Sequence, residues 1–136
     1  MAVAANKKDA LILWFDEITI EDTPLVGGKN SSLGEMYREL TRKGVNIPNG
    51  FAITAEAYRL FIREAGIEIG IKRILSGLNV KDVEKVAEAG HQVRELIKKA
   101  EFPQQLKKEI VEAYEKMCKG YGEHVDVAVR SSATAE

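Results

Sequence analysis

The sequence is poor in cysteine, proline and tryptophan and carries almost no net charge. Its 136 residues include one cysteine, three prolines and one tryptophan, and the formal net charge is −1. The single Cys118 cannot form an internal disulfide, and it adjoins the apolar side of a predicted helix, so we interpret it as a packing residue rather than a catalytic thiol.

Long apolar runs and single-sign charge clusters are also missing. No run approaches the ~20 apolar residues that a membrane helix requires, and the opening residues lack the order of a signal peptide. Acidic and basic side chains alternate along the chain, which argues against a nucleic-acid or anionic-membrane surface. We therefore expect a cytoplasmic protein that binds neither nucleic acid nor membrane.

The composition is that of a soluble globular chain the size of one modest domain, with 45% hydrophobic and 30% charged residues. Periodicity predicts a helix-rich α+β fold in which strands near Leu13, Phe51 and Val127 form a small sheet. We predict that the N-terminal segment, residues 1–9, is a disordered lead into the fold. Amphipathic patterns, with glycine or proline signals at their ends, predict five helices, near 31–43, 57–65, 67–78, 83–100 and 103–119.

A glycine pair followed by a lysine precedes the first of these helices. Gly27 and Gly28 release the backbone, and Lys29 comes just before the predicted first turn, where free amides and the helix dipole favour an anion. The alternative is a plain strand-to-helix turn with a solvated lysine. A Walker A loop is excluded, because that pattern requires a glycine in place of Thr23 and a hydroxyl in place of Asn30.

A second candidate site segment lies at the far end of the chain. Arg130 follows the predicted strand and is followed by Ser131 and Ser132, which together offer a planar cation and two hydroxyl groups for phosphate oxygens. Taken alone, the arginine could equally cap a strand at the surface.

The two segments together resemble the start of the phosphoenolpyruvate synthases, the pyruvate, water dikinases. The resemblance rests on Leu25–Met36, Ile47–Thr54 and Val127–Glu136 and extends from Leu13 to the last residue in the order typical of that family. The related pyruvate, phosphate dikinases share the Gly-Gly-Lys and Val-Arg-Ser motifs, whereas the continuation Ser132 to Glu136 is more similar to the synthases. The helices between the motifs are generic.

The resemblance implies an ATP-binding domain related to ATP-grasp folds, in an enzyme that converts ATP, pyruvate and water to AMP, phosphate and phosphoenolpyruvate with Mg²⁺. It implies that Lys29 and Arg130 contact ATP phosphates, and we add Gly27, Gly28, Ser131 and Ser132 to the expected nucleotide site. Phosphoryl transfer depends mainly on positioning and charge neutralisation, so two cations on the ends of rigid elements suit this role.

The resemblance also implies parts that these residues do not supply. The family uses acidic metal ligands, a phosphohistidine domain and a pyruvate-binding barrel, and we expect the chain to be a truncated part of such an enzyme with those domains as its partners. We assign no catalytic residue and no metal ligand here, and we interpret His91 and His124 as structural or solvated. A homo-oligomer is compatible with this interpretation.

Two alternatives stay open. The chain could be a stand-alone binding or interaction module that catalyses nothing. It could also belong to a related phosphotransferase with another acceptor, such as the rifampicin kinases or the glucan dikinases, which share this kind of nucleotide domain.

Overall fold

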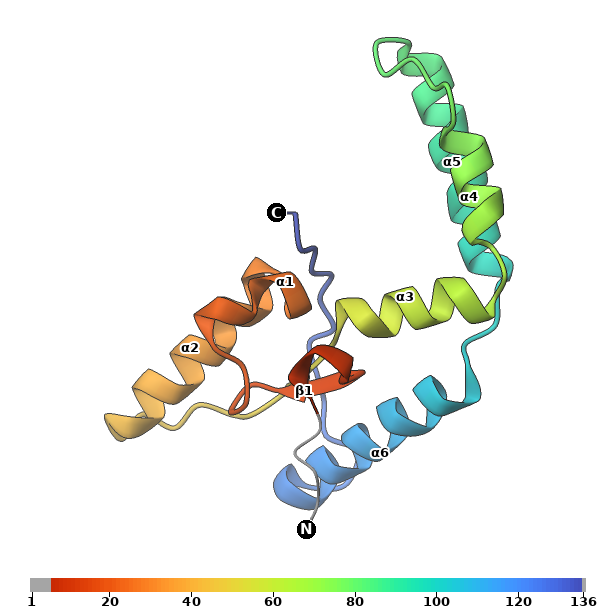
Figure 1. The fold of residues 1–136 in the computed structure, drawn as a ribbon. Helices are drawn as coiled ribbons and strands as arrows, with labels where there is room; N and C mark the ends of the chain where they lie inside the picture. The colour runs from red at the N-terminus through yellow and green to blue at the C-terminus, as the bar shows by residue number, and fades with distance from the viewer. Residues whose placement is uncertain (1–5, 136) are drawn as a thin grey trace. The chain divides into compact units, whose positions relative to one another are not determined.

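A computed structural model describes residues 6–135 of the chain, which form two compact units. The first unit contains residues 6–58 and 105–135, and the second contains residues 59–104. The helices and strands are η1 (Lys7–Asp9), β1 (Ile12–Trp14), η2 (Ile20–Asp22), α1 (Thr23–Val26), α2 (Gly28–Arg42), β2 (Phe51–Ile53), α3 (Ala55–Glu64), α4 (Glu68–Leu75), α5 (Val83–Lys99) and α6 (Gln104–Tyr121), as Figure 1 shows.

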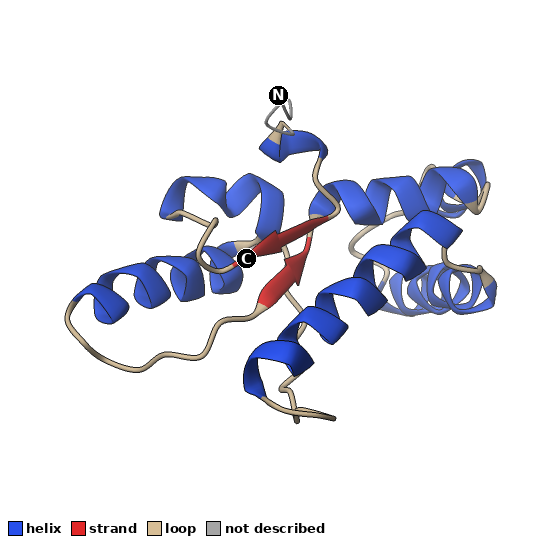
Figure 2. Ribbon diagram, turned by 90° about the horizontal axis from the view of Figure 1, so that it is seen from below, coloured by secondary structure: helices blue, strands red, loops and turns tan. Residues whose placement is uncertain are grey.

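The sheet of the first unit consists of two antiparallel strands, β1 and β2 (Figure 2). Leu13 is paired with Ala52, and both side chains are buried. Thr54 ends the second strand by donating from its hydroxyl to the carbonyl of Ala10 at 2.6 Å, and the same hydroxyl accepts from the Ala57 amide as the cap of α3. The predicted α+β class and the strands near Leu13 and Phe51 are confirmed.

The third predicted strand, near Val127, is wrong. Within the described residues the only strand ladder joins β1 to β2, and residues 125–130 belong to no helix or strand. The Tyr114 hydroxyl donates to the Val125 carbonyl at 3.0 Å, and the Val129 side chain is 91% exposed. Strand-forming composition is not sufficient, because a strand requires a neighbouring backbone with which to exchange hydrogen bonds.

The core of the first unit lies where α1 and α2 meet the sheet. Leu13, Ile18, Val26 and Ala52 form its buried cluster, and Ile18 is fully buried. Gly34 in α2 lets the helix approach this cluster, because a Cβ at that position would lie 2.7 Å from the side chain and carbonyl of Ile18. Acidic residues and Pro24 in the stretch before α2 are typical of a loop, but this stretch contains η2 and α1.

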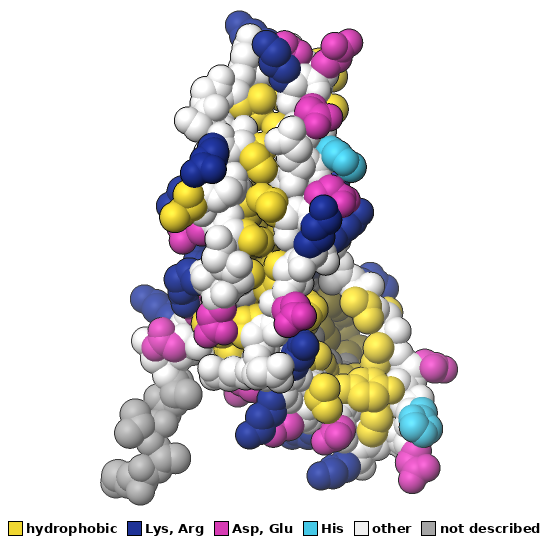
Figure 3. Space-filling model, turned by 90° about the vertical axis from the view of Figure 1, so that its right-hand side faces the viewer, with side chains coloured by type: hydrophobic (Ala, Val, Ile, Leu, Met, Phe, Trp, Pro, Cys, Tyr) yellow, Lys and Arg dark blue, Asp and Glu magenta, His cyan; other side chains and the backbone are white. Residues whose placement is uncertain are grey.

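The second unit is built around the hairpin of α4 and α5, which pack against each other. Leu96 of α5 lies against Gly70 of α4, where a Cβ would be 3.2 Å from its methyl carbon. The hairpin forms the upper part of the view in Figure 3, where hydrophobic side chains make a stripe between charged ones. The large hydrophobic side chains exposed on this hairpin and its loop are Ile69, Leu75, Val80, Val83 and Val86.

The start of the described chain is fixed by an ion pair. Lys7 in η1 donates to the buried carboxylate of Asp22 at 2.6 Å, and Asp22 also accepts from the Thr19 amide at 2.7 Å. Residues 7–9 of the predicted disordered lead therefore form a short 3₁₀ helix, whereas residues 1–5 lie outside the described residues. Within the described range, no helix combines the length and apolar character needed to span a membrane.

Candidate functional site

Gly27 is the corner between α1 and α2. It has φ +82° and ψ 164°, a conformation that is essentially restricted to glycine. Its amide donates to the Thr23 carbonyl at 2.8 Å and so completes α1, while its carbonyl accepts from the Ser31 amide at 3.0 Å and so opens α2. The second helix therefore begins at Gly28, and its first amides have no intrahelical acceptor.

This helix start lies three residues earlier than the sequence predicted. Lys29 is the second residue of α2 rather than a residue before it, and its side chain is exposed. The reason is that Gly27 alone makes the turn, so Gly28 adopts helical geometry and the first turn carries the lysine. The positive end of the helix dipole and the lysine charge are thus in the same turn, which favours a negatively charged ligand.

The carbonyl of Val26 holds the two predicted site segments together. The corner leaves this oxygen without the usual helical donor, and it accepts instead from the Asn30 side-chain amide at 2.8 Å and from the Ser132 hydroxyl at 2.9 Å. Ser132 is 106 residues away from Val26 in the sequence. The chain beyond α6 therefore passes beside the end of α1, as Figure 1 shows.

The Ser132 segment also packs directly against the backbone of Gly27. A Cβ on Gly27 would overlap the Ser132 hydroxyl oxygen and would lie 2.8 Å from the carbonyl oxygen of Ala133. Gly27 thus serves two purposes, the positive φ of the corner and the close approach of the second segment.

A buried hydroxyl pair supports the same corner from inside. Ser31 is 1% exposed, and its hydroxyl donates to the Gly28 carbonyl at 3.0 Å and lies 2.9 Å from the hydroxyl of Thr23. This pair connects α1 to α2 below the exposed first turn. The helix start is therefore held by polar contacts that are independent of any ligand.

Of the six predicted site residues, Gly27 and Ser132 are in direct contact, and the others flank that contact in sequence. Arg130 and Ser131 are exposed, as is Lys29. That Lys29 and Arg130 contact one phosphate chain stays a prediction. Sequence reasoning missed Asn30, whose side chain stabilises the corner; an amide residue in the first turn after a glycine corner was the available signal.

The two histidines lie outside this site. His91 is exposed on α5, and His124 is exposed in the turn after α6 with φ +53°. Among residues 6–135 there is no group of three histidine, cysteine or acidic side chains that could hold a metal ion.

Comparison with known families identifies the class of protein. The family model of the pyruvate phosphate dikinase AMP/ATP-binding domain matches residues 23–136, and the chain belongs to this family. The match begins at the first residue of α1 and so includes the whole Gly27 corner and the Arg130 segment.

The chain is similar to proteins that are named phosphoenolpyruvate synthase. It is 56% identical to the phosphoenolpyruvate synthase of Synechocystis over 97% of its length and 50% identical to that of Aquifex aeolicus over 98%. A probable phosphoenolpyruvate synthase of Methanocaldococcus jannaschii is 48% identical over 100%. The chain spans only 17%, 16% and 11% of these three relatives, respectively.

Proposed function

We propose that the Gly27 corner and the Arg130 segment form the phosphate-binding part of an ATP site. The observation that carries this proposal is the Ser132 to Val26 hydrogen bond of 2.9 Å. It joins the segment containing Arg130 to the last residue of α1, directly before the corner at which the helix containing Lys29 begins. A helix N-terminus with a lysine offers amide donors and a point charge, and an arginine adds bidentate donors for phosphate oxygens.

The domain is then the N-terminal part of an ATP-grasp-like fold in a larger phosphoenolpyruvate synthase. The relatives' name supports the reaction in which ATP, pyruvate and water give AMP, phosphoenolpyruvate and phosphate through a phosphohistidine outside this chain. The role of Lys29 and Arg130 is to hold the phosphates in place and to offset the charge that spreads over their oxygens during transfer.

Magnesium is not assigned to these residues. The described part of the chain has no group of three histidine, cysteine or acidic side chains that could hold a metal ion, and the proposal names no magnesium ligand there. The role of residues 27–29 and 130–132 is confined to binding and orienting the nucleotide.

The test is ATP-dependent autophosphorylation of the full-length polypeptide with single substitutions. We expect Lys29→Ala to reduce phosphoenzyme formation by at least an order of magnitude, because a charged phosphate contact contributes about 1.5–3 kcal/mol. Lys43→Ala is the matched control, since Lys43 is the exposed C-cap residue at the opposite end of the same helix. Equal phosphoenzyme formation in the two variants would contradict the proposed role.

The arginine is tested separately by its geometry. Arg130→Lys keeps the positive charge but loses the planar guanidinium group. We expect this variant to need a higher ATP concentration for half-maximal autophosphorylation, because the charge alone cannot replace the bidentate contact. The control is Arg73→Lys, on the exposed side of α4. The acceptor is tested with the same full-length protein by comparing pyruvate with other acceptors; turnover only with another acceptor would assign the domain to a different phosphotransferase.

A further inference from the structure

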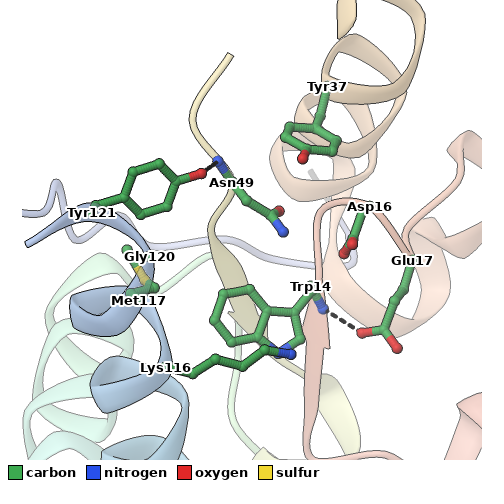
Figure 4. Close-up of a pocket in the computed structure, with 9 residues that line it drawn as sticks. All are labelled: Trp14, Asp16, Glu17, Tyr37, Asn49, Lys116, Met117, Gly120 and Tyr121. Atoms are coloured by element: carbon green, nitrogen blue, oxygen red, sulfur yellow. Dashed lines mark hydrogen bonds between the residues drawn. The ribbon is translucent and has the colours of Figure 1, made fainter. Parts of the chain in front are cut away.

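A second cleft, separate from the six predicted site residues, opens beside β1. Its volume is about 430 Å³, within the range of small-molecule sites. Figure 4 shows that its walls come from separate elements of the first unit, with Trp14 on β1, Tyr37 on α2 and Tyr121 on α6. Three aromatic residues therefore line one cleft, and the face of an aromatic ring attracts a cation.

The charged side chains of the cleft favour the same kind of ligand. Asp16 and Glu17 contribute two carboxylates, and Lys116 contributes one ammonium group. The Trp14 backbone amide donates to the Glu17 carboxylate at 2.8 Å, which holds that side chain against the backbone of β1 (Figure 4). The excess of negative charge disfavours an anion and favours a positively charged guest.

The chain's own lysine already occupies part of this environment. The ammonium nitrogen of Lys116 lies 4.8 Å from the centroid of the Trp14 ring, within the range of a cation–π contact. Lys116 is exposed and has a long flexible stem, so a competing cation can displace it by rotation of its side chain. The position over the indole is therefore both suited to a cation and exchangeable.

The walls of the cleft are fixed by contacts that do not involve a ligand. Trp14 is paired with Phe51 in the sheet, and their ring centroids are 5.4 Å apart. On the opposite wall the Tyr121 hydroxyl accepts a hydrogen bond from the backbone amide of Asn49 at 2.7 Å. A guest thus meets rings whose positions are already set, which reduces the entropy lost on binding.

We propose that this cleft binds an organic cation, a guanidinium or primary ammonium group, in the position that Lys116 occupies over Trp14. The face of the indole holds the cation, and Asp16 and Glu17, which line the same cleft, add an attractive negative charge. The ligand class differs from the anionic nucleotide of the proposed function, so the two proposals stand or fall separately. The source of the cation is either an arginine or lysine side chain of a polypeptide or a free small amine.

The fluorescence of Trp14, the only tryptophan in the sequence, reports directly on this site. We expect N-acetyl-arginine amide and propylguanidine to change the emission of the 136-residue chain with saturation, and the uncharged N-acetyl-norleucine amide to cause no such change. Tighter binding of the arginine amide assigns the site to a polypeptide side chain, and tighter binding of propylguanidine assigns it to a free small organic cation. Equal responses to the charged and uncharged compounds would overturn the proposal. A response to ATP without any response to the two cations would also overturn it.

Substitutions then test the mechanism. Lys116→Met removes the internal competitor and should tighten the binding of propylguanidine roughly two- to five-fold. Lys119→Met is the control, because Lys119 is an exposed residue of the same helix outside the cleft, and this variant should leave the affinity unchanged.

The carboxylates are tested in the same way. Asp16→Asn should weaken binding, whereas Glu21→Gln should not, because Glu21 is an exposed acidic residue outside the cleft. Circular dichroism verifies folding, and Lys116→Gln replaces the methionine variant if that variant unfolds; unchanged affinity in both folded Lys116 and Asp16 variants would contradict the proposal.

Discussion

The hydroxyl of Ser132 lies where a side chain on Gly27 would have to be. The corner between α1 and α2 and the segment after α6 are therefore fitted to each other at atomic distance, although they are a hundred residues apart in the sequence. This contact brings the two segments of the proposed phosphate site together. Its consequences for stability can be measured without any nucleotide.

Gly27→Ala should destabilise the chain by about 2–4 kcal/mol, because it combines backbone strain with overlap against Ser132 and Ala133. Gly44→Ala is the control, since Gly44 has a similar φ of +81° but a Cβ added there would have no atom within 4 Å. Urea unfolding of the two variants gives the comparison. Equal losses would show that the Ser132 segment does not pack against the corner in solution.

The shared acceptor at Val26 predicts non-additive losses. Ser132→Ala and Asn30→Ala each leave the Val26 carbonyl one donor, so each should cost about 0.5–1.5 kcal/mol. The double variant leaves this oxygen of a buried residue without either donor and should cost more than the sum of the single changes. A double-mutant cycle of unfolding free energies measures the coupling. Strictly additive losses of unfolding free energy would contradict the claim that Ser132 and Asn30 share the Val26 carbonyl as acceptor.

Glycines inside helices α2 and α6 should respond to alanine with opposite signs. Gly34→Ala should destabilise the chain by about 1–3 kcal/mol, because the added methyl group meets Ile18 at 2.7 Å. Gly120→Ala in α6 meets nothing within 4 Å and should stabilise the helix by up to about 1 kcal/mol. Thermal unfolding followed by circular dichroism separates the two cases. Stabilisation by Gly34→Ala would show that α2 does not pack closely on Ile18.

The Asp22 ion pair predicts a loss of stability in acid. Burial raises the pKa of Asp22, but hydrogen bonds from Lys7 and the Thr19 amide, together with the lysine charge, outweigh it and leave the pKa below its usual value. The stabilisation is complete above the unfolded-state pKa of about 3.9 and is lost as the pH falls from there through the lower folded-state value.

Asp22→Asn should therefore cost about 1.5–3 kcal/mol at pH 7 and progressively less below pH 4, measured by urea unfolding across that range. Glu21→Gln is the control, because Glu21 is the neighbouring acidic residue, is exposed, and is not part of the Lys7–Asp22 ion pair. A constant difference between the Asp22→Asn and unsubstituted chains from pH 7 to pH 2 would contradict the assignment.

Local patterns predicted most of the helices and two strands of this fold because those elements are determined by apolar periodicity and glycine stops. Gly44, for example, follows α2 with φ +81° and ends it as expected. The short helices before Gly27 were not predicted, because Pro24 and the acidic residues around it are equally typical of loops. The Val125–Val129 strand was predicted from composition and failed for lack of a partner strand.

The two site segments could be found from their residue types, but their contact could not. The Ser132 to Val26 hydrogen bond depends on how α6 returns the chain to the first unit, which no local pattern specifies. The cleft at Trp14 was missed for the same reason, because its residues come from separate segments that have no common motif.

The central claim is that Lys29 and Arg130 hold the same phosphate chain, and a double-mutant cycle on ATP binding to the full-length polypeptide tests it most directly. Calorimetric titration with Lys29→Met, Arg130→Met and the double variant gives the coupling, with Lys43→Met as the control. We predict weakened ATP binding in each single variant and a coupling of at least about 0.5 kcal/mol between them. Unchanged ATP binding in either single variant, or strictly additive losses, would contradict the claim.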